Sequence, residues 1–254
     1  MSAYELISEG VITINAIPIT IDAPGNYDRY RERDDVLYMA KGLGQIDTYV
    51  DFACRLAEQG KIVHDAVELG IFRGGSAVFL HQLLGYPHLV CIDGNPQSIP
   101  RLELYRSIYP NVRTYYGVNQ ADRMKIRQAV EVECPDGIDL VIDDASHFYE
   151  ETKIAFETLF PFLRPGGMYL IEDWGWPHVP AAQAPDHMWA QKSALTNLIF
   201  ELVMAVANEI RAFRELRCGI GFVCVERGPL PLPTDGSFRL DNYLLTRGKP
   251  LGLI

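Results

Sequence analysis

The segment DLVIDDASHFYEETKIAFETLFPFLRPGGMYLIEDW, residues 139–174, decides the fold. Two short apolar runs, at 140–142 and 168–171, each end in acidic residues, and a stretch of helical length separates them. A strand, a helix and a second strand in this order are typical of a parallel pair joined by a crossover helix. Because the carboxyl ends of parallel strands meet at one edge of a sheet, we expect both acidic ends there.

The same alternation extends toward the N-terminus. Strands are predicted at 64–69, 89–93 and 112–116, and helices at 77–84, 98–108, 123–133 and 150–163. Short strands alternating with helices predict an α/β fold: a Rossmann-like, doubly wound, mostly parallel sheet of about seven strands with helices on both faces. In such sheets ligands bind beyond the carboxyl ends of the strands, which is where the acidic residues fall.

The flanks are less regular than this middle. Residues 1–36, with a β-like run at 11–17, are predicted to be an N-terminal appendage that contacts substrate or another subunit, and residues 37–254 to be the main domain. Within the main domain, helices are predicted at 37–59 and 188–211, a loop at 174–185, and late, more antiparallel strands at 221–226 and 243–246. The loop's aromatic side chains either wall an acceptor pocket or pack onto the sheet.

Composition excludes several partners. The chain has 254 residues, of which 48% are hydrophobic, and a formal net charge of −10. Without a basic run, neither nucleic acid nor an anionic membrane surface is an expected partner. No apolar run approaches the ~18 residues of a membrane-spanning helix. Five scattered cysteines without a CxxC pair, and a start unlike a signal peptide, predict a cytoplasmic protein.

A glycine-rich turn, ELGIFRGGS at 68–76, follows the predicted strand 64–69. Glycine lets the backbone turn sharply and lets a ligand approach the main chain, and the helix beyond offers amide hydrogens. The GxGxxG pattern is absent, which disfavours NAD. Asp93 ends the next strand, where a carboxylate accepts the hydroxyl hydrogens of a ribose. The structural alternatives are a cap or an arginine partner for Glu68, and a turn residue in DGNP for Asp93.

Together, the glycine turn and the acid at the next strand end resemble the S-adenosylmethionine site of class I methyltransferases. The resemblance implies that Gly70 and Gly74 line the methionine and ribose parts of the cofactor. It implies that Asp93 binds the ribose diol and makes Gln120 the candidate for the adenine contact. The complete cofactor-binding set that it implies is Glu68, Gly70, Gly74, Ser76, Asp93, Gln120 and Asp143.

The segments DDASH, 143–147, and RPGGMYLIED, 164–173, resemble a narrower group. It comprises metal-dependent macrolide-sugar O-methyltransferases and cephalosporin-hydroxylase-like proteins. By position, the resemblance implies the metal ligands Asp144, Glu172 and Asp173. Hard cations such as Mg²⁺ prefer such carboxylate oxygens. The alternative without a functional role is that the acids at 172 and 173 are solvated charges at a strand end.

The same resemblance makes His147 the general base and Asp144 its catalytic neighbour. An imidazole with an ordinary pKa of about 6.5 suits proton transfer near neutral pH. The alternative is a histidine that only makes structural hydrogen bonds. Asp143 and Asp144 are consecutive residues on an extended segment and point opposite ways, so only one of them is expected to face the site. The family position favours Asp144 as that ligand.

The resulting hypothesis is a Mg²⁺-dependent O-methyltransferase that uses S-adenosylmethionine. Its acceptor is predicted to be a hydroxyl, in a vicinal diol, of a small natural product such as a sugar or a polyketide-derived compound, as in antibiotic biosynthesis. Two alternatives stay open: a cephalosporin-hydroxylase-like methoxylation protein, and a scaffold or rearrangement catalyst that binds the cofactor without transferring its methyl group. A homo-oligomer is also open, because the predicted helix 188–211 is apolar enough for an interface.

Overall fold

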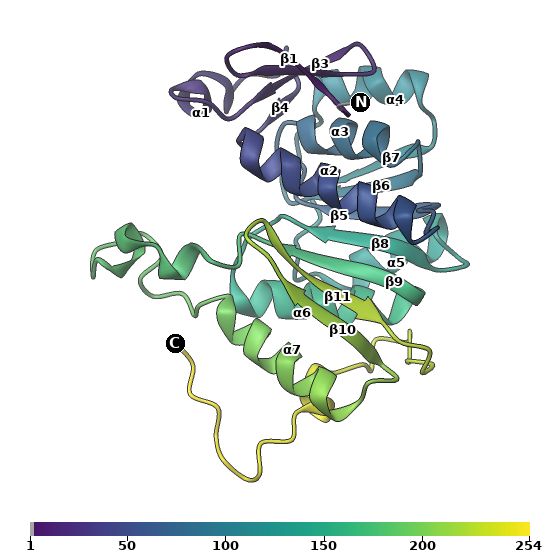
Figure 1. The fold of residues 1–254 in the computed structure, drawn as a ribbon, viewed down its shortest axis with the longest axis vertical. Helices are drawn as coiled ribbons and strands as arrows, with labels where there is room; N and C mark the ends of the chain where they lie inside the picture. The colour runs from purple at the N-terminus through teal and green to yellow at the C-terminus, as the bar shows by residue number, and fades with distance from the viewer. Residues whose placement is uncertain (1–2) are drawn as a thin grey trace. The chain divides into compact units, whose positions relative to one another are not determined.

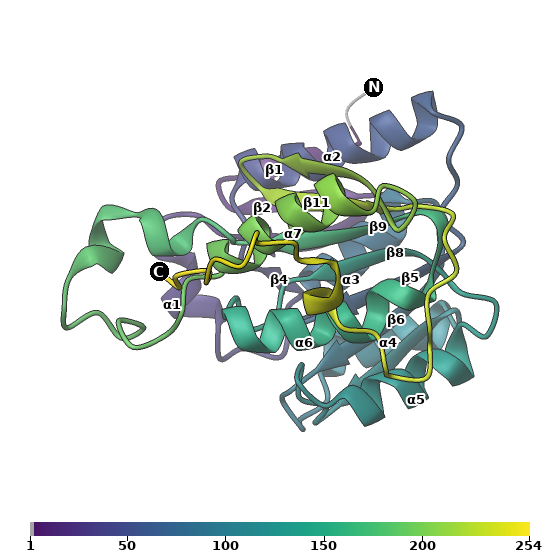
Figure 2. The same cartoon turned by 90° about the horizontal axis from the view of Figure 1, so that it is seen from below.

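The computed structural model describes residues 3–254, which fall into two compact units, one ending at Gly117 and one beginning at Val118 (Figures 1 and 2). The strands of the larger sheet follow the order β10-β11-β9-β8-β5-β6-β7. This order confirms the predicted α/β, Rossmann-like sheet of seven mostly parallel strands. Among residues 3–254, no helix has the length and apolar character that crossing a membrane requires.

In the first unit, three parallel strands carry the glycine turn and Asp93. They are β5 (Asp65–Leu69), β6 (His88–Asp93) and β7 (Val112–Tyr116), and β6 pairs with both of the others. The central apolar residues of β5 and β6 have almost no exposed surface, as expected for strands covered on both faces, whereas β7 lies at the edge of the sheet and is buried only at Val112. The helices of this unit's crossovers are α3 (Gly75–Leu83) and α4 (Pro100–Ile108).

A separate four-stranded sheet is formed by the start of the chain. Strands β1 (Glu5–Ser8), β2 (Val11–Ile14) and β3 (Ile17–Ile21) form an antiparallel meander, and β4 (Tyr38–Met39) pairs parallel with β3. The predicted run 11–17 is therefore two strands. Asn15 and Ala16 between them both have positive φ, as a tight hairpin requires. The short helix α1 (Asn26–Tyr30) lies between β3 and β4.

The predicted helix 37–59 was wrong in its first six residues. Helix α2 spans Leu43–Glu58, because residues 38–39 form β4 and Gly42 is the N-cap, its amide donating to the Gln45 side chain. The predicted domain boundary after residue 36 stays a prediction.

In the second unit, β8 (Ile138–Asp143) and β9 (Leu163–Glu172) are the parallel pair predicted from segment 139–174. Strand β11 (Phe222–Arg227) runs antiparallel to β9, and β10 (Phe213–Cys218) antiparallel to β11, which confirms the antiparallel ending. The helices are α5 (Arg123–Glu133), α6 (Tyr149–Leu159) and α7 (Thr196–Asn208). Four short 3₁₀ helices complete the unit: η1 (Phe160–Phe162), η2 (Trp176–His178), η3 (Pro180–Gln183) and η4 (Leu240–Tyr243).

Two predictions for this unit were wrong. The predicted helix 188–211 is only α7, since residues 188–195 form turns, and the predicted strand 243–246 does not occur, since residue 243 ends η4. The prediction instead missed strand β10, whose sequence FRELRC carries no apolar run. Strand β10 lies at the edge of the sheet, so most of its side chains face water and its sequence lacks the usual strand pattern.

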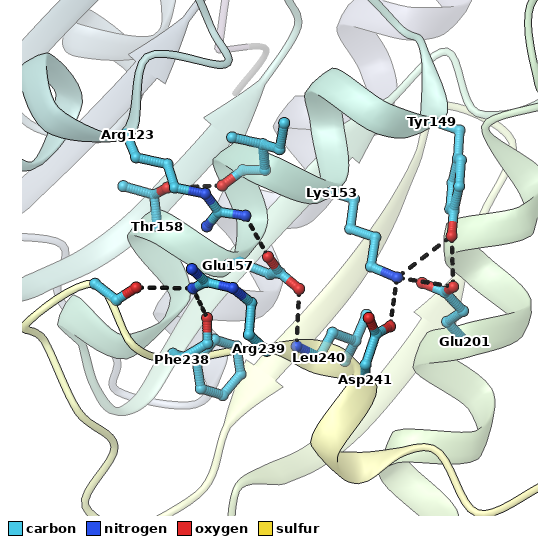
Figure 3. A network of polar contacts seen from close by, with 12 residues as sticks. Arg123, Tyr149, Lys153, Glu157, Thr158, Glu201, Phe238, Arg239, Leu240 and Asp241 are labelled. Atoms are coloured by element: carbon cyan, nitrogen blue, oxygen red, sulfur yellow. Dashed lines mark hydrogen bonds and ion pairs between the residues drawn. The ribbon is translucent and has the colours of Figure 1, made fainter.

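Helix α6 is tied to its neighbours by a half-buried ammonium group. Lys153 Nζ lies 2.9 Å from Glu201 of α7, 2.7 Å from Asp241 of η4 and 3.3 Å from the Tyr149 hydroxyl, and Figure 3 shows how these side chains converge. The Tyr149 hydroxyl in turn donates to Glu201 at 2.5 Å. Because Tyr149 is the first residue of α6, this network fixes the start of the helix just beyond His147.

Candidate active site

The turn after β5 has the backbone conformation that its glycines predicted. Gly70 and Gly74 have φ of 80° and 76°, a region that L side chains rarely adopt. The amide of Gly70 donates to the Ile92 carbonyl at 2.8 Å, which ties the turn to β6. A Cβ atom at Gly74 would lie 3.1 Å from Leu102 Cβ. The turn therefore delivers α3 with its first amides at the carboxyl end of β5.

Asp93 organises this turn from the end of β6. One carboxylate oxygen accepts hydrogen bonds from the amides of Ile71 and Phe72, at 2.9 and 3.2 Å. The other accepts from the amide of Asn95 at 2.7 Å, so Asp93 is also the turn residue that the alternative described. Each carboxylate oxygen can accept two hydrogen bonds. The predicted contact of Asp93 with a ribose diol stays a prediction.

Two further residues of the predicted cofactor set lie in this unit. Glu68 is on β5 and Ser76 is in the first turn of α3, and both side chains are buried. Glu68 thus lies in the interior, on the strand that leads into the glycine turn. Their roles toward the cofactor remain predictions.

In the second unit, Asp143 and Gln120 bind each other. Gln120 donates to the Asp143 carboxylate at 2.6 Å and accepts hydrogen bonds from both the amide and the hydroxyl of Ser146, at 3.1 and 2.5 Å. The Tyr169 hydroxyl donates to the other oxygen of Asp143 at 2.7 Å. These bonds hold the 143–147 turn in place. The predicted contacts of Asp143 and Gln120 with the cofactor remain predictions.

Burial dominates the protonation of Asp143. Its side chain is 2% exposed, and burial raises its pKa from 3.8 to about 7. The hydrogen bond from Tyr169 opposes this rise, whereas the charge of Asp144 adds to it. Of the two consecutive aspartates, Asp143 therefore faces the protein interior and Asp144 is the one that reaches toward solvent.

Asp144, His147 and Asp173 come together beyond the ends of β8 and β9. One potential ligand atom from each lies within 4.8 Å of the other two. The imidazole Nε2 of His147 is 3.9 Å from Asp144 Oδ1 and 3.8 Å from Asp173 Oδ2. Both distances are longer than a direct hydrogen bond. The side chains of Asp144 and His147 are 18% and 19% exposed, so a small molecule or ion can reach them.

The backbone is strained at two members of this cluster. His147 and Asp173 are non-glycine residues with φ of 58° and 49°. Such conformations persist only where the surrounding structure imposes them, and they concentrate at functional sites. The strain directs both side chains toward Asp144, which a regular continuation of β8 or β9 would not do.

Glu172, the third predicted metal ligand, is the last residue of β9. Its side chain is 2% exposed, and it is not among the three residues whose ligand atoms cluster. The donor set that the structure assembles is thus two carboxylates and one imidazole. Carboxylate oxygens suit Mg²⁺ or Mn²⁺, and an imidazole beside them suits either a ligand or a base. The residues present fit a divalent cation at this position.

Residues that the sequence analysis did not assign also shape the site. The Tyr169 hydroxyl reaches Asp143 from the neighbouring strand, which no spacing rule in the sequence revealed. Trp176 donates its indole N–H to the His147 carbonyl at 2.8 Å. The aromatic composition of the loop suggested that Trp176 lies near the site, but it did not indicate that the indole binds the His147 carbonyl.

Comparisons with known proteins find similarity over the part of the chain that contains this cluster. Residues 67–174 match the family described as "Methyltransferase domain". The 8-demethyl-8-alpha-L-rhamnosyl tetracenomycin-C 2'-O-methyltransferase of Streptomyces olivaceus is 42% identical over 74 residues, 29% of this chain and 19% of the relative. Demethylmacrocin O-methyltransferase of Streptomyces fradiae is 46% identical over 63 residues, 24% of this chain and 15% of the relative.

A solved structure shares the fold. The MycE methyltransferase from the mycinamycin biosynthetic pathway, in complex with Mg, SAH and mycinamycin VI, superposes with a TM-score of 0.54 at 22% identity. The superposition covers 72% of this chain and 51% of that chain. The chain thus aligns with about half of that structure and with less than a fifth of each of the two curated relatives.

Proposed function

We propose that this chain, whose residues 67–174 belong to the methyltransferase domain family, is a Mg²⁺-dependent O-methyltransferase that uses S-adenosylmethionine. The acceptor is a hydroxyl of a small natural product, such as a sugar or a polyketide-derived compound, and we favour a vicinal diol. The observation that carries the proposal is the cluster of Asp144, His147 and Asp173, which falls within the matched domain.

The donor set supports the metal. Asp144 and Asp173 offer carboxylate oxygens, and Glu172 precedes Asp173 at the end of β9. We propose Asp144 and Asp173, from this cluster, as ligands of Mg²⁺, and Glu172, which lies buried outside the cluster, as the third ligand that the family resemblance implies. A bound Mg²⁺ ion supplies a positive charge that stabilises the alkoxide developing on the acceptor oxygen. A vicinal diol offers two neighbouring oxygens to such an ion, which is why we favour it over an isolated hydroxyl.

His147 has the position of a general base. Its Nε2 atom faces the same space as Asp144 and Asp173, so a hydroxyl held there lies within reach of the imidazole. Nε2 would accept the proton of the acceptor hydroxyl. S-adenosylmethionine, held by the residues of the glycine turn and Asp93, would supply the methyl group and be released as S-adenosylhomocysteine. Asp144 and Asp173 stabilise the imidazolium that results, because both carboxylates lie within 4 Å of it.

The cofactor assignment has its own support in the first unit. The glycine turn and Asp93 lie together at the ends of β5 and β6, where Asp93 accepts hydrogen bonds from the amides of Ile71 and Phe72. We assign the methionine and ribose parts of S-adenosylmethionine to Gly70, Gly74 and Asp93. The names of the relatives, two of which are O-methyltransferases of glycosylated or macrolide compounds, support the acceptor class.

Calorimetry tests the proposal without knowledge of the acceptor. S-adenosylmethionine and then Mg²⁺ are titrated into the protein and into Asp144→Asn. We expect the wild type to bind both and the variant to bind only the cofactor. Cofactor binding without a metal site would reduce Asp144, Glu172 and Asp173 to structural carboxylates. No cofactor binding would overturn the proposal.

Product mass then tests the reaction. The probes are demethylmacrocin and 8-demethyl-8-alpha-L-rhamnosyl tetracenomycin-C, incubated with cofactor and Mg²⁺. We expect a gain of one CH₂ on an acceptor of this class. Cofactor that stays unchanged with every member of a wider panel of glycosides would favour a scaffold or rearrangement catalyst instead.

A further inference from the structure

Trp176 connects the segment after β9 to the candidate base. Its indole Nε1 donates a hydrogen bond of 2.8 Å to the carbonyl oxygen of His147. His147 has a φ of 58°, a conformation that an L residue keeps only when its surroundings impose it. A change of φ moves the Cβ atom and therefore the imidazole. The bond from Trp176 is thus placed to decide where the His147 ring lies.

The indole itself is held by other aromatic rings. Trp189 packs against Trp176 with ring centroids 4.8 Å apart, and His187 stacks on it at 6.3 Å with an interplanar angle of 17°. Phe148, the residue after His147, contacts both tryptophans edge-on, at 6.2 Å from Trp176 and 5.5 Å from Trp189. Segment 176–189 and the 147–148 turn therefore form one packed aromatic cluster.

We propose that Trp176 is a positioning residue, whose indole N–H holds His147 in its left-handed conformation and so keeps the imidazole between Asp144 and Asp173. The aromatic cluster of Phe148, His187 and Trp189 keeps the indole in register with that carbonyl. The structural part of this inference stands on geometry alone, and its catalytic meaning rests on the proposed function. Segment 176–189 thereby sets the orientation of the base.

The chain offers a matched control. Trp174, two residues earlier, also donates its indole N–H to a backbone carbonyl, that of Gly219 at 3.1 Å in the turn between β10 and β11. Trp174→Phe and Trp176→Phe therefore make the same chemical change, each removing one indole donor and keeping an aromatic ring. Only the second change removes a bond to His147.

Two readouts test the proposal. The first is the NMR spectrum of histidine-labelled protein at fixed pH, in which the ring signals of His147 are identified with His147→Gln. We expect Trp176→Phe to shift or broaden these signals and Trp174→Phe to leave them unchanged. The second is kinetic, with the glycoside acceptor that turns over. Trp176→Phe should lower kcat about tenfold or more and leave KM for S-adenosylmethionine unchanged.

Each outcome bears on the proposal separately from the proposed function. His147 signals that coincide in Trp176→Phe and wild type would overturn it, whether or not the protein methylates a glycoside. Wild-type protein without turnover would count against the proposed function, while the ring signals still decide the role of Trp176. Should Trp176→Phe fail to fold, Trp189→Leu removes the ring that packs on the indole, and the same shift of the His147 signals is expected.

Discussion

His147 and Asp173 show how single residues are placed in this protein. Each has a positive φ, which costs a non-glycine residue roughly 1–2 kcal/mol. At His147 that cost is offset by two bonds from outside the turn: the Ser146 hydroxyl donates to Gln120, and Trp176 donates to the His147 carbonyl. The imidazole therefore reaches the two carboxylates through backbone strain that packed neighbours maintain.

We expect His147→Gln to lower the rate of methyl transfer by about 10²–10⁴, the usual contribution of a general base. Cofactor affinity should not change, because the glycine turn and Asp93 lie elsewhere in the chain. His178→Gln is the control, since His178 follows β9 and its ring contacts the Thr196 hydroxyl at 2.6 Å. A rate for His147→Gln within twofold of that control would exclude His147 as the base.

His81 gives the first unit a pH dependence. It is fully buried on α3, with Nδ1 2.6 Å from the Tyr105 hydroxyl and Nε2 2.9 Å from the Asn111 amide nitrogen. Burial lowers its pKa from 6.5 to about 4. Between these pH values the unfolded chain binds a proton that the folded chain does not, so this group's contribution to stability is present above pH 6.5 and is lost as the pH falls toward 4.

Urea unfolding of wild type and His81→Gln at a series of pH values measures this contribution. The variant should be less stable at neutral pH, because Tyr105 and Asn111 each lose one of their hydrogen-bond partners. The difference between the two proteins should shrink as the pH falls from 6.5 to 4 and stay constant above 6.5. A difference that does not depend on pH would mean that His81 has an ordinary pKa in the folded protein.

At the scale of elements, Gly75 permits α3 to approach β4. A Cβ atom at Gly75 would lie 2.5 Å from the Tyr38 carbonyl carbon and 2.6 Å from the Met39 nitrogen. Both are backbone atoms, so a side chain there cannot be accommodated by a change of rotamer. Gly75, which follows the glycine turn, is therefore needed for the packing of α3 against β4.

We expect Gly75→Ala to destabilise the protein by about 2–3 kcal/mol through this overpacking. Gly44→Ala, in α2, is the matched control, because no atom lies within 4 Å of the position that a Cβ atom would take there. In a helix, alanine is more favourable than glycine by about 0.5 kcal/mol or more. Thermal unfolding compares the two. Equal effects of the two substitutions would show that the approach of α3 to β4 is not close in solution.

Helix α6 also holds the C-terminal part of the chain through Glu157. This carboxylate is buried; one oxygen pairs with Arg123 of α5 and the other accepts from the Leu240 amide at 2.9 Å (Figure 3). The bond to Leu240 fixes the start of η4, from which Asp241 reaches Lys153. One buried acid thus joins three elements.

We expect Glu157→Ala to cost about 2–4 kcal/mol, because it leaves the buried Leu240 amide without its acceptor and Arg123 without its partner. Glu157→Gln keeps an acceptor for the amide and loses only the charge, so it should cost about half as much. Urea unfolding measures both. Hydrogen exchange at the Leu240 amide should accelerate in the alanine variant, and an unchanged exchange rate would contradict this role for Glu157.

Ligands that bind the folded protein should raise the free energy of unfolding of the whole molecule. A ligand present at 100 times its dissociation constant adds about 2.7 kcal/mol to the free energy of unfolding. We therefore expect S-adenosylmethionine and Mg²⁺ each to raise Tm, by about 2–4 °C per kcal/mol for a protein of this size. EDTA should reverse only the metal increment. In Asp144→Asn the rise in Tm caused by Mg²⁺ should vanish, whereas the rise caused by S-adenosylmethionine should remain. If Mg²⁺ still raised the Tm of this variant, the ion would bind elsewhere.

The success of sequence-based prediction differed between residues. The 143–147 turn was predicted as the end of a strand with one inward and one outward aspartate, and Asp143 does lie inside, bonded to Tyr169 and Gln120. Alternation along a strand is a local rule, which is why it worked. The partner Tyr169 lies 26 positions away, and no local rule connects the two residues.

Element boundaries failed where tertiary contacts overrode local preference. Residues 188–195 were predicted to be the start of a helix, but they are not helical. At their beginning Trp189, together with His187, packs on Trp176. The edge strand β10 carries charged side chains and was missed, because its pairing with β11 supplies what its own composition does not.

The sequence by itself determined the α/β class, the parallel strands, the glycine turn and the acids at the strand ends. These depend on periodicity and on glycine's conformational freedom, which act over a few residues. Only the tertiary structure decided that Asp144, His147 and Asp173 form the cluster, that Glu172 lies buried beside it, and that Trp176 binds the His147 carbonyl. Those arrangements arise from strained backbone and from packing between segments distant in the chain, which local patterns in the sequence do not encode.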